Sequence, residues 1–531
     1  MNFPGINSGR AALATWLRVG LATLAVVVCP FLTASQLLAA QAQGASNQKM
    51  ISMREVIDGA LLQNRQLQIE RINPEIQRMT LRASYGYYDP RFQTRAHTES
   101  AVDTGGFDPA NFSADAVFDA DSEVVSSGLV GFLPSGLTYT LGGNYAHSAG
   151  TRNFLDFDSY KMGVGIYAEQ PLLRNMWIDQ PRWQIQINKQ RLKISELGVY
   201  FIAMTVVNFA QQGYYDLIYS WDTLRVQQDL LSNRDQFLKG IQRQIELGMM
   251  TALEEKLARS QLAQVQTELI AASNLVAVAG NNLRTLMGTE EQNWTDELLV
   301  PAEVLLTMPE NFDRATSWRA GLKQRPDLLQ LAENLKSADL TVKYRKNQLY
   351  PLLNLFGSYG LKGSDAIQAF PEDGPPKAFS SVAWDEIQNR DAPNSTIGIL
   401  FELPLTVTTE RANYKMSKEL KKQAELLLKQ KEELVLREIS DAMDLAKFSY
   451  SRVEAAHNAA AFAAEALQAE EQRLQGGTGS IFLVLQAQTE LARTRIVELL
   501  AKRDYNKALS QLYYAEGTLL EHVQFDVRFS Q

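Results

Sequence analysis

Hydrophobic positions recur at two spacings along the chain, and the two spacings alternate in blocks. In the longer blocks, apolar residues lie three and four positions apart, which is the spacing of an amphipathic helix. In the shorter, glycine- and tyrosine-rich blocks every second residue is apolar, which is the spacing of a strand with one apolar face. The pattern predicts helices at about 53–87, 178–247, 253–287, 317–347, 411–475 and 481–516.

The order of these blocks occurs twice. A segment leading to a proline, Asn64 to Pro90, recurs 261 residues later. A glycine turn stands 40 residues before a helix-ending glycine in both halves. Because several landmarks repeat in the same order, the sequence indicates an internal duplication. The paired landmarks are Asn64–Pro90 with Arg325–Pro351, the Pro-Leu strand ends at 171–172 and 404–405, the turns at Gly248 and Gly477, and the stops at Gly288 and Gly517.

The duplication divides the chain into five parts and exposes one difference between the copies. The stretch from Pro90 to Pro171 spans 81 residues, whereas Pro351 to Pro404 spans 53, so the first copy has 28 extra residues in its strand region. We interpret them as an added hairpin at about 124–149. The predicted parts are a signal peptide (1–42), a first repeat (43–288), a linker (289–315), a second repeat (316–519) and a tail (520–531).

The N-terminus has the pattern of a secretory signal. Two arginines, Arg10 and Arg18, precede an apolar stretch, and small residues at 39–42 offer cleavage positions. The only cysteine, Cys29, lies in this stretch without a lipoprotein motif, so we expect neither a disulfide nor a lipid anchor in the mature chain. Loss of both arginines leaves 50 basic against 60 acidic residues, about −10 in net charge, which argues against a nucleic-acid partner.

Enzyme chemistry is not indicated. The four histidines are scattered without metal-ligand spacing, and the chain lacks a nucleophile elbow, a phosphate-binding loop and a dinucleotide fingerprint. We therefore predict no catalytic residues, no cofactor and no resident metal. No segment after the leader has 18 uninterrupted apolar residues, so a membrane-spanning helix is not predicted either.

The predicted element lengths restrict the architecture. A 70-residue helix is about 105 Å long, and two 35-residue helices placed end to end match it. Membrane barrels start at about eight strands. One chain offers two strands in its second copy and two to four in its first, and an open sheet edge is not tolerated in lipid. Either the strands form a small soluble sheet or several chains share one barrel, and the sequence pattern leaves both open.

These motifs in doubled order resemble the TolC-like outer-membrane efflux proteins across about 53–519. The resemblance implies a mainly α fold with a β-barrel part, in which duplicated helical hairpins form an α-barrel. It also implies a homotrimer with one shared twelve-stranded barrel in outer-membrane lipid and a periplasmic helical tunnel. The duct would serve a tripartite efflux or type I secretion system, joined by a periplasmic adaptor protein to an inner-membrane pump. The alternative function is a soluble periplasmic coiled-coil scaffold or adaptor-like protein.

The resemblance also assigns roles to the two turns. Gly248 and Thr251 in one copy, with Gly477 and Ser480 in the other, would be the tips that meet the adaptor. Some family members narrow the periplasmic entrance with two aspartates just past the second tip. Here the matching residues are Leu483 and Gln486, so a constriction at this level would be apolar or neutral. Glu254 matches Leu483 in the first copy, either as part of that constriction or as a solvated carboxylate on the helix surface.

Overall fold

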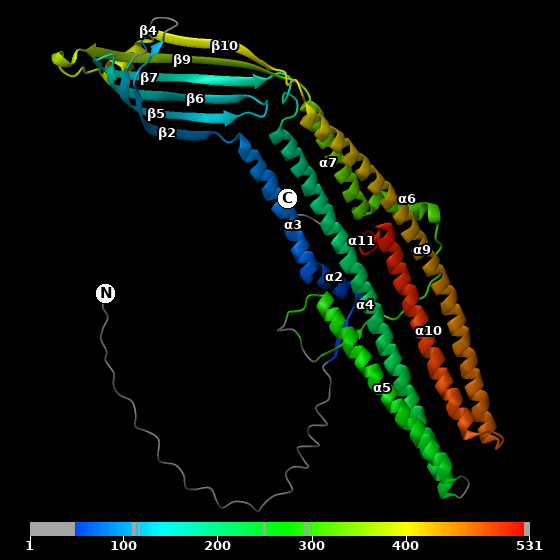
Figure 1. Ribbon diagram of the computed structural model, residues 1–531. Coiled ribbons are helices and arrows are strands. Elements are labelled where there is room, and N and C mark those ends of the chain that lie inside the picture. The colour runs from blue at the N-terminus through cyan, green and yellow to red at the C-terminus, as the bar shows by residue number, and fades with distance from the viewer. Residues whose placement is uncertain are drawn as a thin grey trace, which may run out of the picture. The chain divides into compact units, whose positions relative to one another are not determined.

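The computed structural model describes residues 48–108, 113–114, 117–247, 251–290, 294 and 297–524 (Figure 1). The expected leader at 1–42, with Cys29, therefore lies outside the described residues, as do Gly248 and the end of the tail. The described elements follow one order twice: two helices, a set of strands, a very long helix and a helix that returns along it.

The long helices begin and end within three residues of their predicted positions. At 67 residues, α4 is about 100 Å long. It packs against helices of both copies, namely α2, α3 and α5 of the first and α7 and α10 of the second (Figure 1). The helices are α2 (Met53–Gln63), α3 (Arg65–Tyr85), α4 (Gln180–Glu246), α5 (Ala252–Leu286), α6 (Arg314–Gln324), α7 (Pro326–Asn347), α8 (Ser380–Asn389), α9 (Thr408–Gln475), α10 (Ile481–Glu516) and α11 (Leu519–His522), with short 3-10 turns at Gly86–Tyr88 and Pro371–Asp373.

The opening helix of each copy is two helices, which corrects the predictions of single helices at 53–87 and 317–347. The breaks fall at Asn64 and Arg325, equivalent positions in the duplication, and both residues leave the helical conformation (ψ 123° and 119°). Asn64 caps α3 by accepting a hydrogen bond from the Leu67 N–H (3.1 Å) and donates to the Leu286 carbonyl (2.9 Å) at the end of α5. The end of the returning helix thus meets the start of α3, as the helix lengths predict.

Glycines with positive φ make that meeting possible in both copies. Gly288 (φ +65°) lies against the Gln63 carbonyl, and Gly517 (φ +79°) lies against the Arg325 backbone, where an added Cβ would come within 3.1 Å of the Arg325 nitrogen. Glycine is the residue that adopts this backbone conformation without strain and leaves room for the neighbouring chain. The repeated helix-stop glycines therefore fix where the short helices join.

A buried ionic network holds the second break. Arg325 is 5% exposed and forms ion pairs with Asp327 (2.7 Å) and Glu438 (2.5 Å), and Lys431 lies 2.8 Å from the same Asp327 carboxylate. Burial alone would raise the pKa of Asp327, but its hydrogen bonds and ion pairs with Arg325 and Lys431 outweigh that effect and lower the pKa to about 2. The network ties α7 to the long helix α9.

The main hydrophobic core lies along α4, where α2, α5 and α11 pack on it. Its fully buried members include Val56, Leu67, Tyr214, Leu283 and Leu519. By length and composition, α4 and α5 each contain a window apolar enough to cross a membrane (mean hydropathy 1.4 and 1.2), which the search for uninterrupted apolar runs did not predict. Only 39% and 22% of these windows is buried, so much of their apolar surface is left uncovered by the single chain.

One antiparallel sheet contains six strands in the order β10-β9-β7-β6-β5-β2 (Figure 1). The first copy supplies four of them and the second copy supplies two. The strands are β2 (Arg91–Asp103), β5 (Phe118–Phe132), β6 (Thr138–Arg152), β7 (Leu155–Pro171), β9 (Leu352–Ala369) and β10 (Ala392–Glu402); β1 (Gln48–Ile51) with β8 (Leu298–Pro301), and β3 (Phe107–Asp108) with β4 (Ser113–Ala114), form two small sheets.

Six strands in one chain differ from the four that a twelve-stranded trimeric barrel requires. The hairpin of β5 and β6 overlaps the stretch at 124–149 where the sequence predicts an insertion, and it extends beyond it at both ends. These strands pair in register with β2 on one side and β7 on the other. The extra residues of the first copy are therefore part of the main sheet and widen it by two strands.

Candidate functional site: the hairpin tips and the two faces of the sheet

Two glycines shape the turn between α9 and α10 for different reasons. Gly477 has φ +76° and open space around it, so it is needed for its backbone conformation. Gly479 is needed for close approach, because an added Cβ would lie 2.5 Å from the Leu474 nitrogen. The turn is closed by hydrogen bonds from Gly477 N to Leu474 O (3.1 Å) and from Gly479 N to Arg473 O (2.9 Å). Ser480 then begins α10 as its exposed N-cap residue.

At the first tip, Gly248 lies outside the described residues and Thr251 begins α5. The Thr251 N–H and hydroxyl both donate to the Glu254 carboxylate, at 2.6 and 2.9 Å, and the N–H bond is the carboxylate half of a capping box at the start of α5. Nearby, the hydrogen bond from Gln242 and the ion pair with Arg259 lower the pKa of Glu255, and the Gln242 bond (3.1 Å) ties α5 to α4. Glu254 thus has a structural partner in its own helix.

The residues past the second tip present an apolar surface. Leu483 is 38% exposed, Gln486 is exposed, and the neighbouring Phe482 is 54% exposed. In the first copy Leu253, next to Glu254, is 75% exposed. Sequence reasoning missed Phe482 and Leu253, although both are apolar residues in the first turn after a predicted tip, where no core contact is available.

The two tips are joined by a small hydrophobic cluster. Ile481 and Leu485 at the start of α10 pack with Leu238 and Ile241 near the end of α4 and with Ala258 on α5. All five are less than 9% exposed. The clustering of residues from both copies means that the tips pack on one another within one chain.

A buried arginine completes this contact. Arg234 of α4 is 2% exposed, and its terminal nitrogen Nη2 donates to the Leu485 carbonyl and the Thr489 hydroxyl of α10, both at 2.6 Å. Its other nitrogen, Nη1, reaches Gln261 of α5 at 3.4 Å. One guanidinium therefore links three helices from both hairpins. The sequence gives little indication of this role, because the partners of Arg234 on α10 lie about 250 residues away.

The six-stranded sheet has one apolar and one polar face. Residues that pair across neighbouring strands point to the same face, so the register assigns each side chain. One row is apolar on five of the six strands, with side chains that are 37–72% exposed, and it ends at Ser395 in β10. This row is Phe92, Leu129, Leu141, Ile166 and Tyr359, and further exposed residues of the same face are Val125, Val164, Leu355, Ile397, Ile399 and Phe401.

The adjacent row points to the opposite face and consists of glycines between two amides. Gly128, Gly142, Gly165 and Gly360 pair in succession across four strands, with Gln93 and Asn394 at the two ends. A Cβ on Gly142 would lie 2.5 Å from the Ser127 carbonyl, so the close approach of the strands leaves no space for a side chain at this position. A hollow of about 780 Å³ lies here. Exposed apolar residues on one face and small polar residues on the other are typical of a strand between lipid and water.

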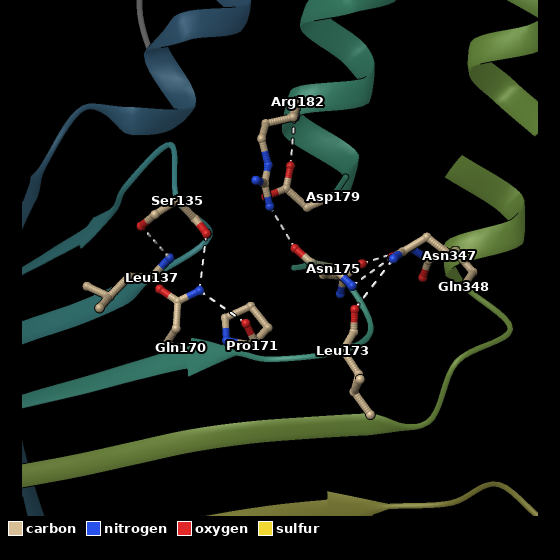
Figure 2. A network of polar contacts seen from close by, with 10 residues as sticks. All are labelled: Ser135, Leu137, Gln170, Pro171, Leu173, Asn175, Asp179, Arg182, Asn347 and Gln348. Carbon is tan, nitrogen blue, oxygen red and sulfur yellow. Dashed lines mark hydrogen bonds and ion pairs between the residues drawn. The ribbon is translucent and has the colours of Figure 1, made fainter. Parts of the chain in front are cut away.

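A polar network fixes the junction between β7 and α4 (Figure 2). Asn175 (φ +66°) is at its centre: its N–H donates to Asn347 Oδ1 (2.7 Å), and its side-chain oxygen accepts from Gln348 (2.8 Å). Arg182 donates to the Asn175 carbonyl (2.7 Å) and to Asp179 (2.9 Å), the N-cap residue of α4. The network joins the first copy to the end of α7 in the second, at the level where strands become helices.

The described residues contain no group of three or more His, Cys, Asp or Glu side chains that could hold a metal ion. Most polar groups at the tips and the junction have hydrogen-bond partners within the chain, whereas the two faces of the sheet and the apolar tip residues are exposed. This arrangement suits the passage of a cargo along the sheet or the docking of a partner at the tips.

Comparison with known proteins identifies the family. The model of the outer membrane efflux protein family matches residues 125–289 and 319–518. The probable outer membrane lipoprotein SilC of Salmonella typhimurium is 21% identical over 329 residues, which cover 61% of this chain and 66% of SilC. The cation efflux system protein CusC of Escherichia coli K12 is 21% identical over 339 residues, 62% of this chain and 68% of CusC. The matches thus span about two thirds of these relatives.

The fold agrees with solved structures over most of the chain. The outer membrane protein VceC of Vibrio cholerae superposes with a TM-score of 0.61 at 15% identity, covering 88% of this chain and 96% of VceC. The α-barrel and β-barrel parts expected from the sequence are those of such channels. Since the family model covers well over half of the chain, this protein belongs to the outer membrane efflux protein family and is an outer-membrane transport protein rather than an enzyme.

Proposed function

We propose that the protein is the homotrimeric outer-membrane duct of a tripartite efflux or type I secretion system. It would pass cargo from the periplasm or an inner-membrane pump to the exterior. The observation that carries the proposal is the two-faced sheet: its exposed apolar face suits lipid and its glycine-lined face suits a water-filled pore. The partly uncovered apolar windows of α4 and α5 support contact with further copies.

The test is the cellular location and assembly of the mature protein. The duct predicts detergent-requiring trimers in the outer-membrane fraction that dissociate on heating. The alternative, a soluble periplasmic scaffold, predicts a monomer or small oligomer in the soluble periplasmic fraction. Such a scaffold would expose the apolar row of the sheet, which includes Phe92 and Tyr359, to water, and contiguous apolar patches of that kind are rare on soluble proteins.

The tips are proposed as the docking surface for the periplasmic adaptor, through Gly248 and Thr251 in the first copy and Gly477 and Ser480 in the second. The shape of the second turn supports this. Gly477 faces open space, and its positive φ is a backbone conformation that a bulky residue adopts only with strain. G477V should abolish efflux and adaptor cross-linking while trimers persist. G476V is the matched control, since Gly476 has φ −75° and only ordinary contacts. Normal efflux in G477V would argue against docking at this turn.

We also propose that the periplasmic constriction, formed around Glu254, Leu483 and Gln486, is apolar or neutral at the second tip. The exposed Leu483 supports this, as does the use of Glu254 in capping α5. Multivalent cations added from the periplasmic side should then leave the conductance of reconstituted channels unchanged, and L483D should make the channel sensitive to them. Strong block of the unaltered channel by such cations would contradict the proposal.

A further inference from the structure

The six-stranded sheet ends in two strands that each have one neighbour within the described part of the chain. β2 pairs with β5 and β10 pairs with β9, and nearly every residue of both edge strands is exposed. In a membrane, the free N–H and C=O groups along such edges must be paired. The two edges run antiparallel to each other, because all five pairings across the six strands are antiparallel.

We propose that β2 of one copy pairs with β10 of the next, so that three copies close an eighteen-stranded barrel. The inference rests on the proposed trimeric duct, and it concerns the strand number and the interface between copies. Since each copy contributes an even number of strands, every pairing in the closed ring is antiparallel. The β5–β6 hairpin accounts for the six strands beyond the twelve that the resemblance implies.

The register between copies follows from where the edge strands end. The row of paired residues that starts at Arg91 in β2 reaches Thr396 in β10. β10 continues for six more residues to Glu402, and prolines at 90 and 404 limit pairing beyond these two ends. If both ends lie at the same membrane boundary, Arg91 of one copy faces Glu402 of the next.

This register gives the geometry of a closed barrel. A stagger of six residues per copy adds up to a total stagger of eighteen residues around the ring of three copies. With a rise of about 3.3 Å per residue and about 4.8 Å between strands, the strands tilt by about 35°, which is within the range of closed barrels. The backbone radius is then about 17 Å, against about 11 Å for twelve strands at the same tilt.

The same register matches the faces and the charges of the two edges. Arg91 and Glu402 both point to the polar face, and their charges are opposite. One residue further along, Phe92 meets Phe401 on the apolar face, where they are 72% and 59% exposed in the single chain. A shift by one residue would place apolar side chains on the polar face. The glycine row, ending in Gln93 and Asn394, then lines a wide aqueous pore.

Disulfide trapping in intact outer membranes tests the register. The only native cysteine, Cys29, is replaced by serine, and F92C is combined with F401C. Under mild oxidation this double variant should form covalent dimers and trimers that reducing agent removes. The single variants, and T94C with F401C, should form few or none. R91E should weaken the trimer against heating, and adding E402R should restore it, which keeps the test open if the cysteine variants assemble poorly.

The outcomes separate the two proposals. Heat-dissociable trimers in which F92C and F401C remain uncrosslinked, with no rescue of R91E by E402R, would overturn the interface and leave the duct intact. Preferential trapping of T94C with F401C would overturn the predicted stagger. A protein that purifies as a monomer from the soluble periplasm would overturn the proposed function itself.

Discussion

The contact between the two hairpin tips depends on one buried guanidinium, so the decisive perturbation is Arg234→Met. Methionine keeps an unbranched side chain about as long as the aliphatic stem of arginine, so the packing around the stem is largely retained. The change removes both 2.6 Å hydrogen bonds to α10, which Arg234 donates to Leu485 and Thr489. It should loosen the first turns of α10 from α4 while leaving the rest of the bundle in place.

The magnitude can be worked out from the contacts. Hydrogen bonds from a charged group contribute about 1.5–3 kcal/mol each. Two considerations reduce the sum: the Leu485 carbonyl keeps a bond from Thr489 (3.0 Å), and the buried Arg234 Nε has no acceptor among the described residues, so its removal relieves a cost. A net loss of about 2–4 kcal/mol is expected, which raises the local opening constant by a factor of roughly 30 to 1,000.

Hydrogen exchange of the purified protein measures this constant. Amides near the start of α10, around Val484 to Gln488, should exchange faster in R234M by that factor, while amides around Leu217 in the main core should be unchanged. R243M is the matched control, because Arg243 lies on the same helix and is exposed. Equal exchange in R234M and the unaltered protein would refute the claim that Arg234 holds the tips together.

Three further predictions concern the second break, the second tip and the glycine row. D327N should lower the melting temperature at neutral pH. The depressed pKa of Asp327 contributes about 2 kcal/mol to the free energy of unfolding, which is present above pH 3.8 and lost as the pH falls towards 2. The melting temperature of the variant, followed by circular dichroism, should therefore fall less across this pH window than that of the unaltered protein. G479A should weaken adaptor binding about tenfold or more in pull-downs, because its Cβ would lie 2.5 Å from the Leu474 nitrogen. G142V should reduce the trimer recovered from outer membranes several-fold, since its Cβ meets the Ser127 carbonyl at 2.5 Å.

Each of these three predictions has a control variant or a result that would contradict it. G476A, whose Cβ would be 3.5 Å from its nearest neighbour, should bind adaptor normally, and equal binding by G479A would contradict the tip geometry. In G357V the added side chain points to the apolar face, where its Cβ would lie at an ordinary contact distance of 3.6 Å from the nearest atom, so this variant should assemble. Normal assembly of G142V would contradict the close strand approach. An unchanged acid profile in D327N would contradict the role of its ion pairs.

The helix ends were predictable because residues close to each end in the sequence determine them. The capping box at Thr251 and the positive-φ glycines at 477 and 517 stop or start helices through neighbouring residues alone. The breaks at Asn64 and Arg325 were not predicted, because helical periodicity continues across them. They exist because each packs against a glycine from the end of the returning helix, about 190–220 residues away.

In the strand region too, features that depend on neighbouring residues were predictable, and features that depend on distant residues were not. The alternation in the glycine- and tyrosine-rich blocks predicted strands with one apolar face, and the 28 extra residues of the first copy predicted an added hairpin. The glycine row required the register of four strands, since Gly142 and Gly360 have no relation in sequence. Arg234 could not be identified as a link between the tips for the same reason: nothing near it in the chain indicates α10.

The central claim is that these strands cross the outer membrane with one face to lipid and the other to water. Labelling by a membrane-impermeant maleimide in outer-membrane vesicles tests it on β6, with Leu141→Cys on the apolar face and Asn144→Cys on the polar face. Both side chains are exposed in the single chain, so their reactivity should diverge only in a barrel. The account predicts rapid labelling of Asn144→Cys and protection of Leu141→Cys until detergent is added. Equal labelling of both positions in membrane-inserted, trimeric protein would contradict it.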